Sequence, residues 1–441
     1  MFETLKQAFK VKEIRIKIWF TLLFILLYRI GSYIPVPGIG KELLSETDLS
    51  SLTYLNIMNM MTGGSLANGT LFAMGIGPYI NASIIMQLLA VAIPSLERLS
   101  KQGEEGRKKV SQYTRYVTIL LAIIQGVGIV LNYKDKLTTS DGTPLSEMLW
   151  NQEWLAYVIT ILFFTAGTVI TMWIGERITD YGVSNCISLL IFAGIVATAG
   201  KTVVSMIERI GAAEGKQTTL EDFWKLIGMI VAIFVVFVCI IYVELAERKI
   251  PVQYAKQVRG QKMYGGQSTV IPIKVNSNGV LPLIFAYSIL SFPELIITLI
   301  GKADSSFGLW WAKWMGSNSW LYPIVLSLLI IFFAYFYTSI QFNPDDISKS
   351  IQQNGGFIMG IRPGKPTAEY LKKISGRITL FGAIFLALVA LVPSLIFKAI
   401  DASSYGAFTA TGMLIVVSVA IEFNTALESQ IMMKNYKGFL K

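Results

Sequence analysis

Apolar segments long enough to cross a membrane alternate with polar connections along the whole chain. An α-helix rises about 1.5 Å per residue, so roughly 20 apolar residues span the ~30 Å hydrocarbon core of a bilayer. Segments of this kind cover residues 18–33, 78–93, 117–131, 155–174, 187–204, 223–243, 279–300, 321–340, 378–396 and 407–427. Because backbone groups in lipid must pair within their own helix, the pattern predicts an all-α integral membrane protein with ten transmembrane helices.

One apolar stretch, residues 61–87, does not fit this pattern. Ser65 suits the N-cap of a helix that runs to about Met74, and Gly75 then ends this helix before Pro78 starts the next. A helix of that length reaches only about half of the ~30 Å hydrocarbon core. Unpaired helix ends are tolerated at membrane depth only where they are buried in protein or face a water-filled cavity. We therefore expect a short re-entrant helix beside a cavity.

Composition narrows the class of function. The 441 residues are 53% hydrophobic and 15% charged, and the mean hydropathy of +0.56 lies outside the range of ordinary soluble domains. Histidine is absent, which disfavours metal and hydrolytic chemistry. Cys186 and Cys239 lie in apolar segments, as buried small hydrophobes do. The sequence also lacks a nucleophile–base pair and a phosphate-binding glycine loop, so we expect neither enzyme activity nor a cofactor.

The distribution of basic residues predicts the orientation of the chain. Placing the N-terminus inside puts most of the 38 Lys and Arg residues in inner segments, so both termini are expected to be cytoplasmic. Residues 1–17 combine five basic residues with apolar residues at helical spacing, which predicts a cytoplasmic amphipathic helix at the membrane surface. Arg29, near the outer end of the first span, is expected to extend its charge toward the interface.

The ten predicted spans divide into two halves of five. Residues 18–204 form the N-terminal half, residues 205–222 an extracytoplasmic hinge connection and residues 223–441 the C-terminal half. An odd number of spans in each half gives the halves opposite topology, and such inverted repeats place the functional path at their interface. Two long cytoplasmic loops, 244–277 and 341–376, interrupt the C-terminal half, and long loops are commonly functional.

Two patterns leave the function open between a transporter and a pore. Glu294 and Glu422 lie in apolar segments and could serve an ion-coupled secondary transporter, because intramembrane charge usually marks an ion path. Isoleucines at positions i and i+4 instead suit a narrow apolar ring, because a helix projects both side chains from one face. Such pairs are Ile80 with Ile84 and Ile187 with Ile191.

Six motifs in one order connect the chain to a known family. They are Tyr28–Gly38 (YRIGSYIPVPG), Phe72–Leu88 (FAMGIGPYINASIIMQL), Gly103–Arg115 (GEEGRKKVSQYTR), Ile191–Val196 (IFAGIV), Gln267–Asn276 (QSTVIPIKVN) and Gly360–Thr367 (GIRPGKPT). Through them the whole chain resembles the SecY family, the central channel subunits of bacterial protein translocases. The resemblance implies two inverted five-helix halves that open toward lipid on one side. It also implies a passive channel through which unfolded secretory proteins cross the bacterial cytoplasmic membrane and membrane segments leave sideways.

The resemblance further implies the residues of the site. The pore ring would be Ile80, Ile84, Ile187, Ile191, Ile284 and Ile415. A plug segment that closes the outer funnel would be Gly64, Ser65, Leu66, Ala67, Asn68, Gly69, Thr70, Leu71, Phe72, Ala73 and Met74. The basic positions of the docking loops would be Arg248, Lys249, Arg259, Lys262 and Arg362.

The same resemblance implies the partners. SecE would clamp the two halves, and SecG would be a further small subunit. The docking loops would bind the ribosome through ribosomal RNA, and also the separate motor ATPase SecA, which would hydrolyse the ATP. Signal peptides and unfolded polypeptides would be substrates, and phospholipid would surround the protein.

Overall fold

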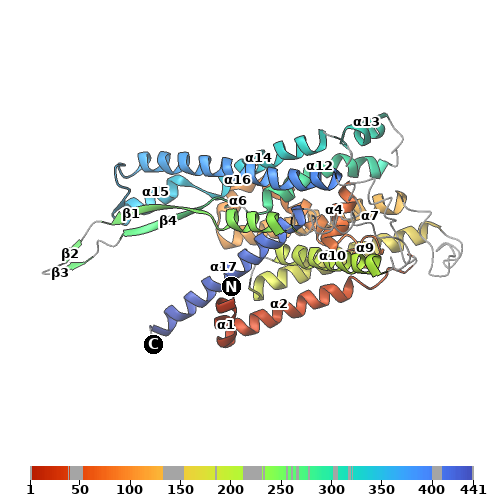
Figure 1. Ribbon diagram of the computed structural model, residues 1–441, viewed down its shortest axis with the longest axis horizontal. Helices are drawn as coiled ribbons and strands as arrows, with labels where there is room; N and C mark the ends of the chain where they lie inside the picture. The colour runs from red at the N-terminus through yellow and green to blue at the C-terminus, as the bar shows by residue number, and fades with distance from the viewer. Residues whose placement is uncertain are drawn as a thin grey trace. The chain divides into compact units, whose positions relative to one another are not determined.

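The computed structural model describes most of the chain (Figure 1). The described residues are 2–37, 39, 53–132, 153–183, 186–211, 231, 234–254, 257–259, 262–264, 268–276, 279–300, 306–315, 319, 321–399 and 410–439. Most of the predicted hinge connection, from residue 212 on, and most of residues 223–233 lie outside them. The chain divides into two compact units, one of residues 1–217, 288–322 and 419–441 and the other of residues 218–287 and 323–418.

The first unit is built from helices, and one of its apolar clusters contains part of the plug segment. Its helices are α1 (Phe2–Lys10), α2 (Lys12–Gly31), α4 (Thr53–Thr62), α5 (Gly77–Ala92), α6 (Pro94–Lys101), α7 (Glu104–Asn132), α9 (Glu153–Tyr181), α10 (Cys186–Gly211) and α13 (Ser306–Met315), with the second parts of α12 (Leu281–Ile300) and α17 (Ala410–Phe439). This cluster joins buried residues of α4, α7 and α9 to Leu66, Ala73 and Met74 from the plug segment.

The second unit combines long helices with a small sheet. It holds a helix at Phe234–Glu244, the beginning of α12 and of α17, α14 (Leu321–Gln341), α15 (Pro344–Gln353) and α16 (Lys365–Ala399). Strands β1 (Glu247–Tyr254), β4 (Ser268–Lys274) and β5 (Gly356–Phe357) form an antiparallel sheet in the order β4-β1-β5. Short strands β2 (Gln257–Arg259) and β3 (Lys262–Tyr264) pair farther along the same hairpin (Figure 1).

Each of the ten predicted apolar segments contains a helix among the described residues. Five of these helices are long and apolar enough to cross a membrane, or six if α5 and α6, which are bent by 108° at Ile93, count as one span. By length and composition the described residues thus support a multi-pass protein, while the number of ten spans stays a prediction.

The prediction of one helix over residues 1–17 is wrong. Val11 takes an extended conformation, with φ of −87° and ψ of 113°, and separates α1 from α2. α1 packs against α17, where the Thr4 hydroxyl donates a hydrogen bond to the Glu428 carboxylate at 3.2 Å. Ala8 of α1 is buried in one apolar cluster with Leu427 and Ile431 of α17. Folding α1 back on α17 requires the break in the helix.

The plug segment is not the short helix that the sequence predicted. Residues 63–76 form a series of turns, and the neighbouring short helix, α4, precedes them. Gly64 and Gly69 have φ of +88° and +57°, a left-handed conformation that a right-handed helix excludes. Ser65 does not act as an N-cap, because its hydroxyl donates back to the carbonyl of Thr62 at 2.9 Å.

The prediction of an all-α fold is also incomplete, because both long loops are folded and one of them is a β-hairpin. Alternate residues of β1, Ile250 and Val252, face inward and pack with Ile273 of β4. Ile351 of α15 and Leu371 of α16 complete the same apolar cluster. The predicted loops 244–277 and 341–376 therefore fold together as one body within the second unit.

Candidate functional site

The plug segment lies in the core of the first unit. Leu66 and Met74 are both 0% exposed. They belong to one apolar cluster with Ala122 of α7 and Phe164 of α9. The segment is therefore packed within protein. Burial of this kind is one of the two conditions under which a non-helical backbone is tolerated at membrane depth.

The backbone of the plug segment pairs with the connection that follows α2. Thr70 forms an isolated antiparallel bridge with Pro35. The N–H of Leu71 donates to the carbonyl of Ile34 at 2.8 Å, and the N–H of Val36 donates to the carbonyl of Gly69 at 3.2 Å. These bonds satisfy polar groups that burial would otherwise make costly.

Two glycines on neighbouring helices let this backbone approach closely. A Cβ placed on Gly167 of α9 would lie 1.8 Å from the carbonyl oxygen of Leu71. A Cβ placed on Gly194 of α10 would lie 1.9 Å from the carbonyl oxygen of Met61, just before the plug segment. One helical turn farther along α10, the Thr198 hydroxyl donates to the carbonyl of Met60 at 3.3 Å. The plug segment and its base therefore rest on helix surfaces that accept no larger side chain.

An aromatic pair fixes the end of the segment. The ring of Phe72 stacks on buried Tyr28 of α2, with centroids 5.5 Å apart and an angle of 13° between the planes. Gly31 makes room for this ring, because a Cβ there would lie 2.0 Å from Phe72 Cε2. The motifs around Tyr28 and Phe72 are thus in contact in the fold.

The predicted ring isoleucines lie on four helices. Ile80 and Ile84 are buried on α5, which begins with Pro78 in its first turn. Ile191 is buried on α10 and Ile187 is half-buried there. Ile284 of α12 and Ile415 of α17 are buried and belong to the second unit. The spacing places each pair of the first unit on one helix face, while the assembly of all six into a ring stays a prediction.

The basic loop residues lie on the folded body of the second unit. Arg248 and Lys249 are exposed on β1, where Lys249 forms an ion pair with Glu247 at 3.2 Å. Arg362 is exposed in a turn that the Thr367 hydroxyl holds by donating to the Arg362 carbonyl at 2.8 Å. Arg259 and Lys262 face each other in the register of β2 and β3, and their side chains lie outside the described part.

Some charged groups of the helices pair with residues that are far away in the sequence. Arg115 of α7 donates to Glu176 of α9 at 2.6 Å, although 61 residues separate them. Asn276 donates to the buried carboxylate of Glu244 at 2.9 Å and closes the base of the hairpin. Glu294 is half-buried and Glu422 is exposed. No group of three or more Cys, Asp and Glu residues suited to a metal ion occurs in the described part of the chain.

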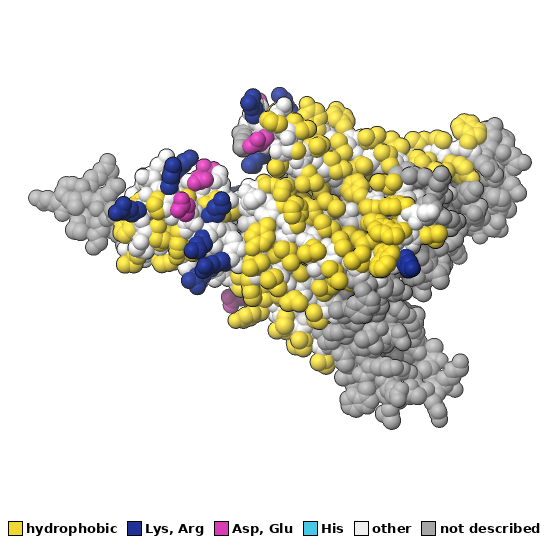
Figure 2. Space-filling view, turned by 90° about the horizontal axis from the view of Figure 1, so that it is seen from above, with side chains coloured by type: hydrophobic (Ala, Val, Ile, Leu, Met, Phe, Trp, Pro, Cys, Tyr) yellow, Lys and Arg dark blue, Asp and Glu magenta, His cyan; other side chains and the backbone are white. Residues whose placement is uncertain are grey.

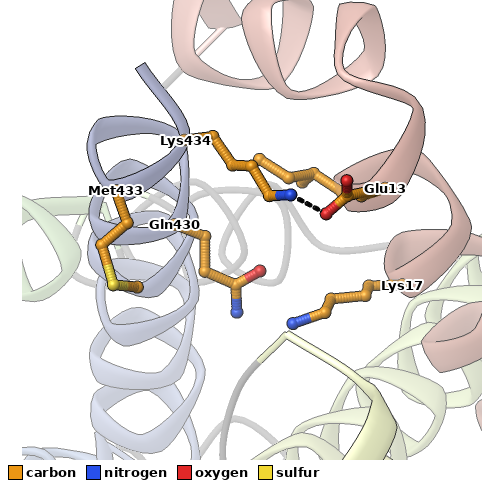
Figure 3. A pocket seen from close by; sticks show the side chains of 6 residues that line it. Glu13, Lys17, Gln430, Met433 and Lys434 are labelled. Carbon is orange, nitrogen blue, oxygen red and sulfur yellow. Dashed lines mark ion pairs between the residues drawn. The ribbon is translucent and has the colours of Figure 1, made fainter. Parts of the chain in front are cut away.

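A pocket of about 190 Å³ lies where α2 and α17 meet in the first unit (Figure 3). Lys434 of α17 reaches across it to form an ion pair with Glu13 of α2, while Lys17 and Met433 line its walls. The side chain of Gln430 donates to the carbonyl of Val183 at 3.3 Å. These contacts hold α17 against α2 and against Val183.

The surface is that of a protein in lipid. Figure 2 shows a face on which hydrophobic side chains cover most of the described surface, with charged side chains in a few separate groups. Trp19, Leu120, Leu162 and Phe381 are among the many exposed large apolar residues. An apolar surface of this extent marks contact with a membrane. Together with the buried non-helical segment, it defines a polytopic helical membrane protein of the channel and transporter class.

Comparisons with known proteins identify the family within this class. The SecY family model matches residues 70–424. "Protein translocase subunit SecY" of Streptomyces coelicolor is 41% identical and that of Halalkalibacterium halodurans 40% identical, each alignment covering 100% of both chains. The chain therefore belongs to the SecY family. As a member, it is the protein-conducting subunit of a protein translocase, and no comparison supports a secondary transporter.

Solved structures agree on the fold. The structure of a protein-conducting channel superposes with a TM-score of 0.65 at 20% identity, covering 94% of this chain and 91% of that one. Sec61 in the canine ribosome–channel complex gives a TM-score of 0.62 at 19% identity, with the same coverage. At these identities the likeness concerns the fold.

Proposed function

We propose that unfolded secretory polypeptides cross this channel through the isoleucine ring and that hydrophobic segments leave it sideways into lipid. The channel has ten transmembrane helices in two inverted halves, residues 18–204 and 223–441, joined by the connection 205–222. It lies in the bacterial cytoplasmic membrane with both termini in the cytoplasm, as the excess of basic residues in the inner segments favours. An apolar ring offers ions no polar partner, so it resists leakage while a chain passes.

The plug segment, residues 64–74, closes the channel when it is idle. The observation that carries this proposal is the seat of the segment, which combines buried apolar side chains, backbone hydrogen bonds to the connection after α2 and close glycine contacts with α9 and α10. All of these contacts must break before the segment can leave its seat. The same contacts give the idle state a defined closed position.

The folded loops of the second unit dock the partners that drive transport. Arg248, Lys249, Arg259, Lys262 and Arg362 supply positive charge, which suits ribosomal RNA phosphates and acidic surfaces of SecA through a salt-sensitive attraction. Two proteins of the same fold, Sec61 and yeast Ssh1, have been solved in ribosome complexes, which supports the ribosome as a partner. SecE and SecG complete the complex, and SecA or translation supplies the energy.

Reconstitution tests this proposal. Proteoliposomes that contain the chain with SecE and SecG, supplied with SecA, ATP and an unfolded precursor, should make the precursor resistant to external protease. Deleting residues 64–74 should raise ion conductance in the absence of precursor. Protection that does not depend on this chain would overturn the channel, and an unchanged conductance would overturn the plug.

A further inference from the structure

Two cations from different helices meet at the base of the plug segment. The Arg29 guanidinium of α2 lies against Gly63, where an added Cβ would come within 2.3 Å of its Nη1. The Lys201 ammonium of α10 lies against Gly64, 3.2 Å from the position of an added Cβ. Both cations also flank Tyr33, at 6.0 Å and 5.6 Å from the ring centroid. Both charges thus lie against the turn at Gly63 and Gly64 and close to the ring of Tyr33.

The positive charge at this point is not balanced by any described residue. Arg29 Nη1 is buried and has no hydrogen-bond partner. Among the described residues, neither Arg29 nor Lys201 forms an ion pair. The aromatic ring offers each cation only a weak attraction, and the two cations repel each other. A guanidinium nitrogen kept from water without an acceptor is costly, so the arrangement calls for an anionic oxygen. The sequence suggested that Arg29 extends its charge toward the interface. In the structure its guanidinium instead lies against Gly63.

The surroundings of the two cations indicate where this oxygen comes from. Ile30, Ile34 and Val204 are exposed beside them, and Tyr33 is 62% exposed. Exposed aliphatic residues next to a tyrosine and basic side chains are typical of the depth at which lipid headgroups lie. A guanidinium binds phosphate through paired N–H groups, and a lysine adds a point charge.

We propose that Arg29 and Lys201 bind the phosphodiester of a membrane lipid at the base of the plug segment. The lipid phosphate accepts hydrogen bonds from the guanidinium and the ammonium, and its acyl chains lie along the apolar surface formed by α2 and α10. Binding of this phosphate braces the turn at Gly63 and Gly64. Lipid binding to the idle protein is the test of this site. The site therefore does not depend on the proposal that residues 64–74 close the channel.

Native mass spectrometry of the full chain, released from nanodiscs of phosphatidylglycerol and phosphatidylcholine, tests this site. The double variant Arg29→Gln with Lys201→Gln should retain phosphatidylglycerol at least fivefold less well than the wild type, and Arg29→Lys should retain it at an intermediate level. Lys313→Gln, which removes an exposed lysine of α13, is the matched control and should bind as the wild type does. Equal retention by the double variant and this control would overturn the proposal.

Two further arms separate the sources of the anion. Free inorganic phosphate should not displace the lipid, because it lacks acyl chains; displacement at millimolar phosphate would show a site for the free ion. Glu42, Glu46 and Asp48 are acidic residues that follow α2 in the sequence, so they are the alternative anions to test. The combined variant Glu42→Gln, Glu46→Gln and Asp48→Asn should leave lipid retention unchanged. A severalfold increase would mean that carboxylates of the chain itself occupy the site, which would overturn the lipid assignment.

Discussion

Replacing Gly167 of α9 should displace the plug segment from its seat without disturbing α9 itself. In Gly167→Ala the added Cβ of α9 would lie 1.8 Å from the carbonyl oxygen of Leu71. A carbon and an oxygen normally approach to about 3.4 Å, so the plug backbone must move by roughly 1.5 Å. Gly200→Ala on α10 is the matched control, because nothing lies within 4 Å of its Cβ position.

The expected magnitude follows from the cost of overpacking. Forcing an extra methyl into a well-packed site costs about 1–3 kcal/mol. This cost is paid only while the segment is seated, since displacement relieves the contact. The ratio of unseated to seated plug should therefore rise roughly 5- to 150-fold. Alanine is a better helix former than glycine by about 1 kcal/mol, so neither variant should lose stability through its helix.

Ion conductance of the idle channel in planar bilayers measures this ratio. We expect Gly167→Ala to conduct at least about fivefold more than the wild type and Gly200→Ala to match the wild type. Thermal unfolding of both variants checks that the fold is intact. If Gly167→Ala conducts no more than Gly200→Ala, the close contact with Leu71 does not hold the plug segment, and the reasoning fails.

Three further predictions concern other contacts. Phe72→Ala removes the ring stacked on Tyr28 and should weaken the seated state by about 3 kcal/mol, so idle conductance should rise at least tenfold; wild-type conductance would contradict this. Glu244→Ala leaves the buried amide of Asn276 unpaired, which should lower stability by about 1–3 kcal/mol, while Glu244→Gln should lose less; equal unfolding midpoints would count against it. Arg362→Glu should reduce SecA-driven export at low salt, and full export would remove Arg362 from the docking surface.

The hydrophobic pattern predicted the helices well because lipid leaves the backbone few alternatives. Each of the ten predicted spans contains a helix, and Pro78 lies in the first turn of α5, as expected. The pattern also predicted that residues 61–87 are broken, and it placed them beside a cavity, whereas the structure buries Leu66 and Met74 in an apolar cluster. It could not give the local conformation, because the turns at Gly64 and Gly69 depend on distant partners such as the carbonyl of Ile34.

The loops and charges were harder to predict for the same reason. The inward alternation of Ile250 with Val252 in β1 indicates a strand, but the many charged residues around it obscured the pattern. The pairing of Arg115 with Glu176 depends on how α7 packs against α9, which neither segment encodes alone. The roles of the ring and plug residues came from the family resemblance, because isoleucines in a membrane helix usually face lipid or a neighbouring helix.

The most direct test of the transport path is a cross-link between the channel and a moving chain. In a protein with Cys186→Ala and Cys239→Ala, single cysteines at Ile84 and Ile284 should each form a disulfide with a cysteine in a secretory precursor arrested during transport. A cysteine at Leu120, which is exposed on α7, should form none. Disulfides at both ring positions are the predicted result, and their absence from both would contradict passage through the isoleucine ring.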